Sequence, residues 1–255
     1  MDFKPKGFLI DLDGTVYLKE KEIEGSFKFI KKLQESNIPH RFLTNTTGRT
    51  IKEIKENLLK MGMDTKEENI LNPIVIADYY LKENNIKFFC FAGEKKIGEQ
   101  LKSSLQTDTN PEVVILGDIQ KCCSYEELNK IYGYLMNGSK LISTSYSEFY
   151  ISKDGRKIDT GAFAKLFENL TDEKAVIIGK PSNMFYQMAL NSLGFSKDEV
   201  IAVGDDIKTD IKGAKAQGIY SVLVKTGKYD PDSLSKAEIK PDKILDRLED
   251  LIYFL

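Results

Sequence analysis

The sequence lacks most features that mark a specialised class of protein. Its 255 residues include no tryptophan and one histidine, and 37 Lys+Arg nearly balance 39 Asp+Glu, for a net charge of −2. No block of basic residues stands clear of acids, which argues against a nucleic-acid partner. No apolar run reaches the roughly 18 residues that a spanning helix needs, which argues against a membrane role. The chain is long enough to bury a core without a disulfide or metal.

Cysteine is also scarce: Cys90, Cys122 and Cys123 are an odd number with no CxxC spacing. We therefore expect free thiols rather than a disulfide framework and, since the chain starts with no secretory pattern, a reducing cytoplasmic location. Cys122 and Cys123 could instead bind a metal, but a zinc site takes about four ligands and His40 is the only histidine. We expect His40 to lie at the surface or at a strand edge.

Short apolar segments alternate with helical patterns along the chain, which is typical of parallel βα units. Five such segments predict buried strands of one sheet: 8–12, 41–44, 175–179, 200–204 and 220–224. Between them the spacing predicts helices over about 51–59, 182–193 and 206–218. We expect each of the first two helices to have one apolar face. In the first it comprises Ile51, Ile54, Leu58 and Leu59, and in the second Met184, Phe185, Met188 and Ala189.

The middle of the chain has strand and helix signals of its own. Strands are predicted at 88–92, 113–116, 141–144 and 149–152, with a helix at 125–136. We therefore predict an α/β fold in which a parallel-sheet core is interrupted by a second, inserted α/β domain. The predicted division is 1–72 and 177–255 for the core, and 73–176 for the insertion.

The strongest local signal is the segment DLDGT at 11–15, which follows the apolar run Phe8 to Ile10. Open α/β sheets bind ligands at the carboxyl ends of their strands, where Asp11 and Asp13 would lie. Buried carboxylates are costly unless they are paired, and a hard divalent cation pairs well with oxygen ligands. The alternative is an ordinary acidic turn at the end of a strand.

Three more polar groups follow predicted strands of the same sheet. They are Thr44 with Asn45, then Lys180, and then Asp205, Asp206 and Asp210. Each alone has an ordinary explanation, respectively a polar turn, a solvated lysine, and acids that favour a helix N-terminus. Together they suit a phosphoryl group, because a cation and a lysine neutralise its oxygens while a hydroxyl and amides hold it. A carboxylate could then attack phosphorus to form an aspartyl-phosphate.

Four segments in this order resemble the four motifs of the haloacid dehalogenase (HAD) superfamily. They are DLDGT at 11–15, LTNTT at 43–47, GKP at 179–181 and VGDDIKTD at 203–210. The insertion resembles the C2-type α/β cap of the NagD-like branch. The resemblance implies a Rossmann-like core with a cap and a Mg²⁺-dependent phosphatase acting on a small phosphorylated metabolite. It also implies activity on pyrophosphate or phosphoramidate bonds and a homodimer formed through the cap.

The resemblance also implies roles for the residues at the reacting phosphorus. Asp11 would be the nucleophile and a Mg²⁺ ligand. Asp13 would protonate the leaving oxygen and later activate water, with its backbone carbonyl on the metal. Lys180 would offset the charge of the phosphoryl oxygens and orient Asp11.

The remaining motif residues would hold phosphate and metal. By the same resemblance, Thr44 and Asn45 would bind the phosphoryl oxygens. Asp205 would bind Mg²⁺, directly or through water, with Asp206 and Asp210 supporting it. Tyr146, Glu148 and Tyr150 could line the substrate entrance or belong to a half-buried strand with aromatics on one face.

Two other functions use similar residues. A phosphotransferase or mutase would use the same aspartyl-phosphate with a second substrate hydroxyl in place of water. A signalling receiver combines an acidic cluster with Thr and Lys, but it needs only one domain and places its acceptor Asp on a later strand. We therefore favour hydrolysis over a receiver, while the sequence separates hydrolysis poorly from phosphoryl transfer.

Overall fold

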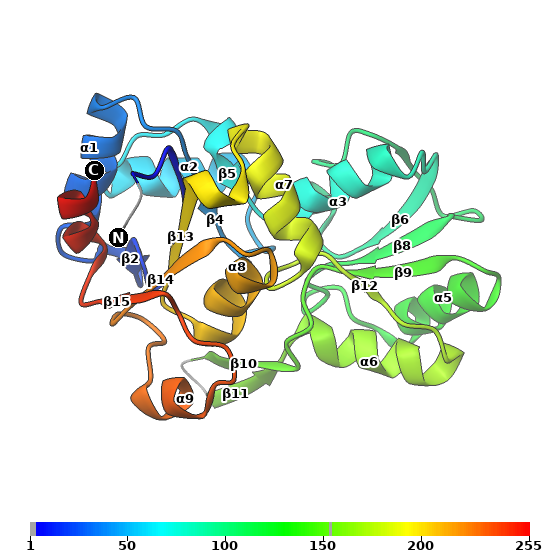
Figure 1. The fold of residues 1–255 in the computed structure, drawn as a ribbon. Coiled ribbons are helices and arrows are strands. Elements are labelled where there is room, and N and C mark those ends of the chain that lie inside the picture. Colours follow the sequence, from blue (N-terminus) through cyan, green and yellow to red (C-terminus); the bar gives the residue numbers. More distant parts are fainter. Residues whose placement is uncertain (1–3, 153–154) are drawn as a thin grey trace. The chain divides into compact units, whose positions relative to one another are not determined.

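The computed structural model describes residues 4–152 and 155–255, which form two compact α/β units (Figure 1). The first unit comprises Met1–Thr44, Ile51–Leu71 and Lys180–Leu255, and the second comprises Asn45–Thr50 and Asn72–Gly179. Each unit contains its own parallel sheet. The predicted α/β class, with a Rossmann-like core and a second α/β part, is confirmed.

The sheet of the first unit has six parallel strands in the order β15-β14-β13-β1-β4-β5. Their bounds are β1 Gly7–Asp11, β4 His40–Leu43, β5 Ile70–Leu71, β13 Val200–Gly204, β14 Tyr220–Val224 and β15 Lys243–Leu245. Strands β1 and β13 are neighbours at the centre, and every residue in both is buried. From β1 the chain adds strands first on one side and later on the other. The carboxyl ends of β1 and β13 therefore mark the switch point where such sheets bind ligands.

Helices cover both faces of this sheet. On one face Phe8 and Ile10 of β1 join a core cluster with Phe29 of α1, Leu58 of α2 and Leu251 of η4. These elements span α1 Ser26–Glu35, α2 Ile51–Lys60 and η4 Leu248–Phe254. The opposite face is covered by α7 Asn183–Leu193 and α8 Lys212–Ala216. Because side chains alternate along a strand, Asp11 points to the same face as Leu9, away from that cluster.

The shorter elements of the first unit connect these layers. They are β2 Tyr17–Leu18, β3 Lys21–Glu22, η1 Glu67–Asn69, η2 Lys197–Glu199, η3 Ile207–Ile211 and α9 Pro231–Lys236.

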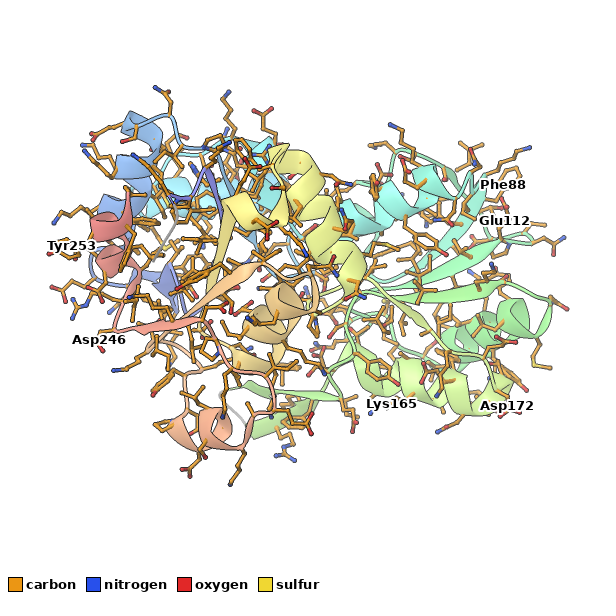
Figure 2. The ribbon with its side chains drawn as sticks, viewed as in Figure 1. Phe88, Glu112, Lys165, Asp172, Asp246 and Tyr253 are labelled. Carbon is orange, nitrogen blue, oxygen red and sulfur yellow. The ribbon has the colours of Figure 1, made fainter. Side chains whose placement is uncertain are left out.

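The second unit has a five-stranded parallel sheet in the order β12-β9-β8-β6-β7 and a separate hairpin, β10-β11. Its strands are β6 Phe88–Ala92, β7 Leu105–Gln106, β8 Val113–Leu116, β9 Lys140–Ser143, β10 Phe149–Ser152, β11 Gly155–Ile158 and β12 Val176–Ile177. Its helices are α3 Pro73–Glu83, α4 Lys95–Gly98, α5 Tyr125–Met136 and α6 Thr160–Thr171. At the amino end of the sheet, Glu112 accepts hydrogen bonds from the backbone N–H groups of Lys87 and Phe88 (Figure 2).

Most predicted strands agree with the structure, but the segment 175–179 does not. It was expected to be a buried strand of the first sheet. Instead Val176 and Ile177 are half-buried and form β12, which pairs with Ile142 and Ser143 of β9 in the second unit. A short apolar run identifies a strand without identifying its sheet, because its partners lie far away in the sequence.

Two predicted helical faces also need correction. In α2, Ile54 and Leu58 are buried, but Leu59 is 54% exposed. In α7, Met184 and Met188 are only partly buried. The buried face of α7 is instead Phe185, Tyr186, Ala189, Leu190 and Leu193. The helix expected after Asp206 begins as a π-helix, η3, before it continues as α8.

The structure also places the three cysteines and the single histidine. Cys90 is buried, Cys122 and Cys123 are exposed, and all three are free thiols. His40 is the first residue of β4 and is only 6% exposed, so of the two positions expected for it the surface was wrong and the end of a strand is what the structure shows. Within the described ranges, no helix is both long enough and apolar enough to cross a bilayer.

Candidate active site

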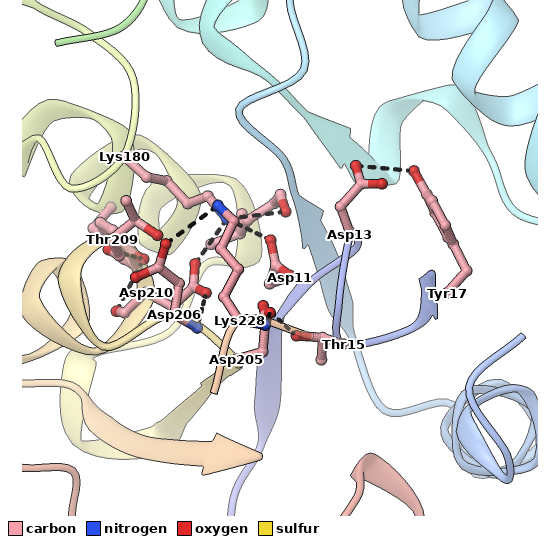
Figure 3. A network of polar contacts seen from close by, with 12 residues as sticks. Asp11, Asp13, Thr15, Tyr17, Lys180, Asp205, Asp206, Thr209, Asp210 and Lys228 are labelled. Carbon is pink, nitrogen blue, oxygen red and sulfur yellow. Dashed lines mark hydrogen bonds and ion pairs between the residues drawn. The ribbon is translucent and has the colours of Figure 1, made fainter. Parts of the chain in front are cut away.

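The centre of the site lies where β1 and β13 end side by side (Figure 3). Asp11 is the last residue of β1, and Asp205 directly follows β13. Both side chains are buried, with 6% and 2% of their surface exposed. Two carboxylates at this depth need compensating charge or ligands, because an unpaired buried charge is costly.

Lys180 provides part of that compensation. Its Nζ lies 2.6 Å from Asp11 Oδ1 and 2.8 Å from Asp210 Oδ1, and it donates a longer bond of 3.4 Å to the carbonyl of Leu43. The lysine is only 5% exposed. One buried ammonium thus bridges two carboxylates that come from distant parts of the sequence, as Figure 3 shows.

Asp205 is held by groups from two loops. Thr15 Oγ1 donates to Oδ1 at 3.3 Å, and the backbone N–H of Lys228 donates to Oδ2 at 2.6 Å. The loops can approach this closely because Gly14 and Gly227 both have positive φ and lack a Cβ, which would overlap the Asp205 carboxylate. These are positions where only glycine fits without strain.

Asp206 and Asp210 begin the helical segment after β13. The backbone N–H of Asp206 donates to Asp210 Oδ2 at 3.1 Å. Asp206 Oδ1 accepts from the backbone N–H of Lys208, and its Oδ2 lies 3.3 Å from Lys228 Nζ. Asp210 therefore connects Lys180 to the loop that carries Asp205 and Asp206.

Asp13 differs from these acids because it is exposed. Its Oδ2 accepts a hydrogen bond from the hydroxyl of Tyr17 at 3.2 Å. Figure 3 shows it on the other side of Asp11 from Lys180. An exposed carboxylate beside a buried one can exchange protons with solvent, which suits an acid or base.

The second predicted motif divides between the two units. Thr44 follows β4, is 2% exposed, and its backbone N–H donates to the carbonyl of Leu71. Asn45 begins the segment Asn45–Thr50 of the second unit. The role expected of Thr44 and Asn45, to hold the phosphoryl oxygens, therefore stays a prediction.

Burial and charge repulsion raise the pKa values of the three buried acids of the site, Asp11, Asp205 and Asp210. Burial raises the pKa of Asp11 to about 7, although Lys180 opposes the shift. The same balance raises the pKa of Asp210 to about 7, and burial with the neighbouring Asp210 raises that of Asp205 to about 6. For Lys180, burial favours the neutral form, but Asp11 and Asp210 outweigh it and raise its pKa well above the usual value. The single positive charge of Lys180 does not neutralise the three buried carboxylates of Asp11, Asp205 and Asp210.

Sequence and structure comparisons identify the family. The family model for haloacid dehalogenase-like hydrolases matches residues 8–104. A second family model, described as HAD-hydrolase-like, matches residues 177–251. Haloacid dehalogenase-like hydrolase domain-containing protein 2 of Pongo abelii is 31% identical over 224 residues, 88% of this chain and 85% of its own. The chain belongs to the haloacid dehalogenase-like hydrolase family.

Two further relatives are similar over nearly the whole chain. Phospholysine phosphohistidine inorganic pyrophosphate phosphatase of Xenopus laevis is 31% identical over 250 residues, 95% of this chain and 92% of its own. The crystal structure of 4-nitrophenylphosphatase from Thermotoga maritima has a TM-score of 0.90 and 29% identity. That likeness covers 98% of this chain and 97% of the Thermotoga chain.

In this HAD-like hydrolase the acids fit a hard divalent cation. Asp11, Asp205 and Asp210 can each offer a ligand atom within 4.8 Å of the others. Asp11 Oδ2 is buried and has no hydrogen-bond partner within the described part of the chain. Carboxylate oxygens are the donors that Mg²⁺ prefers, and a cation there would relieve the repulsion that raises these pKa values.

Three residues of the hydrolase site were not predicted from the sequence. Thr15 was quoted within a motif but given no role, although it contacts Asp205. Lys228 follows β14, so the rule that ligands gather at strand ends could have found it. Tyr186 lies on the buried face of α7 and contacts the segment that carries Asp210. No sequence pattern marked it.

Proposed function

We propose that this hydrolase is a Mg²⁺-dependent phosphatase that hydrolyses a small phosphorylated metabolite through an aspartyl-phosphate on Asp11. The observation that carries the proposal is the buried Lys180 ammonium between Asp11 and Asp210, with Asp11 Oδ2 accepting no hydrogen bond from residues 4–152 or 155–255. This arrangement leaves one carboxylate oxygen for a reacting group and provides positive charge beside it. Similarity to two relatives, phospholysine phosphohistidine inorganic pyrophosphate phosphatase and a 4-nitrophenylphosphatase, supports the reaction type.

In the first step a carboxylate oxygen of Asp11 attacks phosphorus. The bond from phosphorus to the leaving oxygen breaks, and Asp13 donates a proton to that oxygen as it departs. Lys180 keeps Asp11 oriented through its contact with Oδ1. Asp13 is exposed, so its side chain is open to the solvent with which a general acid exchanges its proton.

In the second step water attacks the phosphoryl group on Asp11. Asp13, now ionised, takes a proton from that water. The bond between phosphorus and Asp11 breaks, inorganic phosphate leaves, and the Asp11 carboxylate is restored. The same residue therefore acts first as acid and then as base.

The cation would be held by Asp11, the backbone carbonyl of Asp13, and Asp205. When bound, Mg²⁺ offsets the negative charge of the phosphoryl oxygens. We assign Asp206 and Asp210 to its support, because Asp210 already accepts from Lys180 and from the Asp206 N–H. Thr44 and Asn45 are assigned to the phosphoryl oxygens. The homodimer through the cap and the cytoplasmic location stay predictions.

Hydrolysis of 4-nitrophenyl phosphate tests the proposal most cheaply. We expect turnover that needs Mg²⁺, stops in chelator and is lost in Asp11→Asn. The matched control is Asp246→Asn, which removes an exposed carboxylate of the first unit paired with Lys225 and should leave turnover unchanged. Activity that persists in chelator, or in the Asp11 variant, would contradict the proposal.

The same assay separates hydrolysis from phosphoryl transfer. We expect one inorganic phosphate for each nitrophenol released, even with added alcohols or hexose phosphates. A large deficit of phosphate, matched by a new phosphate ester, would instead identify a phosphotransferase. A panel with pyrophosphate, phosphohistidine, sugar phosphates and pyridoxal phosphate would then define the substrate class.

A further inference from the structure

Tyr186 is a fully buried tyrosine whose hydroxyl has no part in the mechanism above. It is 1% exposed and lies on α7, six positions after Lys180. Its hydroxyl donates toward the backbone carbonyls of Thr209 at 3.2 Å and Asp210 at 3.0 Å. Phenylalanine would fill the same core volume, so the hydroxyl is the part of this side chain that needs an explanation.

The carbonyls that Tyr186 contacts belong to the π-helix η3, Ile207–Ile211. The backbone N–H of Ile211 reaches the carbonyl of Asp206 at 3.3 Å, a π-type bond five residues back. Such turns are rare and occur often at functional sites. Here the turn sets the direction of Asp210, whose carboxylate meets Lys180 Nζ at 2.8 Å and the Asp206 N–H at 3.1 Å.

The neighbouring helix makes room for the tyrosine ring. A Cβ at Gly213 of α8 would overlap atoms of the Tyr186 ring. Glycine inside a helix costs about 1 kcal/mol relative to alanine. Apart from proline, glycine is the residue that favours a helix least. It stands here at the position where any larger residue would collide with the Tyr186 ring, whose hydroxyl contacts η3.

We propose that Tyr186 is a positioning residue that fixes the π-turn, so that the Asp210 carboxylate shares the Lys180 ammonium with Asp11. Without the hydroxyl, Asp210 is free to move and Lys180 pairs with Asp11 alone. A nucleophile held in a tighter ion pair attacks more slowly, while substrate binding by other groups is little affected. The inference rests on the proposed role of Asp11 as nucleophile.

The test is Tyr186→Phe, which removes only the hydroxyl. We expect kcat to fall about 10-fold with KM within about 2-fold, because a small displacement of a reacting group affects the transition state more than binding. Calorimetric titration with Mg²⁺ should show an affinity lowered several-fold, since Asp210 belongs to the acidic cluster. The matched control is Tyr134→Phe in the second unit, which removes a similar bond to the Asp108 carbonyl at 2.7 Å and should change neither quantity.

A double-mutant cycle separates positioning from general stability. If Tyr186 acts through Asp210, Tyr186→Phe should lower kcat by less than about 2-fold in an Asp210→Asn background. Full 10-fold losses in both backgrounds would overturn the inference, as would unchanged kcat and Mg²⁺ affinity with only a lower unfolding midpoint.

A second variant covers the case in which Tyr186→Phe does not fold. Gly213→Ala keeps the hydroxyl but displaces the ring, and we expect the same loss of kcat at constant KM. Unchanged kinetics in that variant would contradict the inference. If the wild-type protein turns over no phosphate ester, the proposed function fails, whereas the Mg²⁺ titrations still test the link from Tyr186 to Asp210.

Discussion

The two units have the same kind of parallel sheet but different chemistry at the strand ends. In the first unit β1 and β13 end in the buried carboxylates of Asp11 and Asp205. In the second unit the equivalent edge has hydroxyls, and these are satisfied locally. Thr144 Oγ1 donates to the carbonyl of Leu116, and Thr160 Oγ1 donates to that of Gly117. The architecture alone therefore does not specify a site, and the side chains at the edge do.

The second unit also has a buried carboxylate, Glu168, and the comparison with Asp11 is instructive. Both are 6% exposed. Glu168 accepts from the Ala175 N–H and the Tyr146 hydroxyl, both at 2.9 Å, and pairs with Lys174. Burial works to raise its pKa, but these donors outweigh burial and lower it. A fully paired acid stabilises the fold, whereas an acid with an unpartnered oxygen and a raised pKa is available to a ligand.

The largest expected difference is between neutralising Asp11 and neutralising a structural acid. Asp11→Asn should lower kcat at least about 10⁴-fold, as loss of a catalytic carboxylate does in other enzymes. Its free energy of unfolding without metal should stay within about 1 kcal/mol of wild type, because the amide removes a charge that burial disfavours. Steady-state kinetics and urea unfolding measure the two effects. If Asp11→Asn keeps as much as a tenth of the wild-type kcat, Asp11 is not the catalytic acid that distinguishes the first unit from the second.

The two lysines that pair with these acids should also differ. Lys180→Met leaves Asp11 and Asp210 buried without their cation and should cost about 3–5 kcal/mol at pH 8 in chelator. Lys174 is 83% exposed, so Lys174→Met should cost less than about 1 kcal/mol. Urea unfolding of both variants checks this. Equal losses would mean that the ammonium of Lys180 is no more important than a surface charge.

Glu168→Gln should lower the stability of the protein and leave its turnover unchanged, which is the reverse of the effect expected for Asp11→Asn. The amide keeps the shape but weakens the bonds from Ala175 and Tyr146, so the second unit should lose about 1–3 kcal/mol. Turnover of 4-nitrophenyl phosphate below the unfolding transition should stay unchanged. A fall in kcat with no loss of stability would show that Glu168 belongs with the functional acids.

The smallest expected effect is a pH dependence of the free energy of unfolding that His40 gives to the first unit. Burial lowers the pKa of His40, the only histidine, whose Nδ1 lies 3.1 Å from the carbonyl of Ile38. The unfolded chain then binds a proton that the folded chain does not, so stability is present above pH about 6.5 and is lost as pH falls. Relative to His40→Asn, wild type should lose up to about 1 kcal/mol between pH 6.5 and 5.5, because the unfolded imidazole is already half protonated at pH 6.5.

Equal pH dependence of wild type and His40→Asn would show that His40 takes up its proton without cost. The second unit should lose stability only at lower pH. The lowered pKa of Glu168 keeps that carboxyl ionised in the folded state, so its contribution disappears as pH falls below the usual glutamate range.

The sequence predicted the parts that depend on local pattern. Strands β13, β14, β6 and β8 and helix α5 have the predicted bounds, because apolar runs ended by glycine or polar residues define them locally. Asp11 and Asp210 come from β1 and from the segment after β13, neighbouring strands of one parallel sheet, and both meet Lys180. The pattern of apolar runs assigned β12 to the wrong sheet, since strand partners are chosen by tertiary packing.

Two features of the site had no local signal. The five residues of the π-turn, Ile207–Ile211, are too few to show a pattern that distinguishes it from the α-helix that was expected there. The hydroxyl of Tyr186 matters only because η3 lies next to α7 in the fold. Lys228, in contrast, follows a predicted strand and could have been found by that position, and its backbone N–H reaches Asp205 because β13 and β14 are neighbours.

The most direct test is to look for phosphate on Asp11. Asp13→Asn should slow release of the phosphoryl group, because the activating base is lost. The variant would be mixed with 4-nitrophenyl phosphate and Mg²⁺, quenched in acid, digested, and analysed by mass spectrometry. We expect one phosphoryl group on the peptide that contains Asp11, removable by hydroxylamine and absent when Asp11 is also changed to Asn. Turnover by wild type with no phosphorylated peptide, or with phosphate on another residue, would contradict the proposed mechanism.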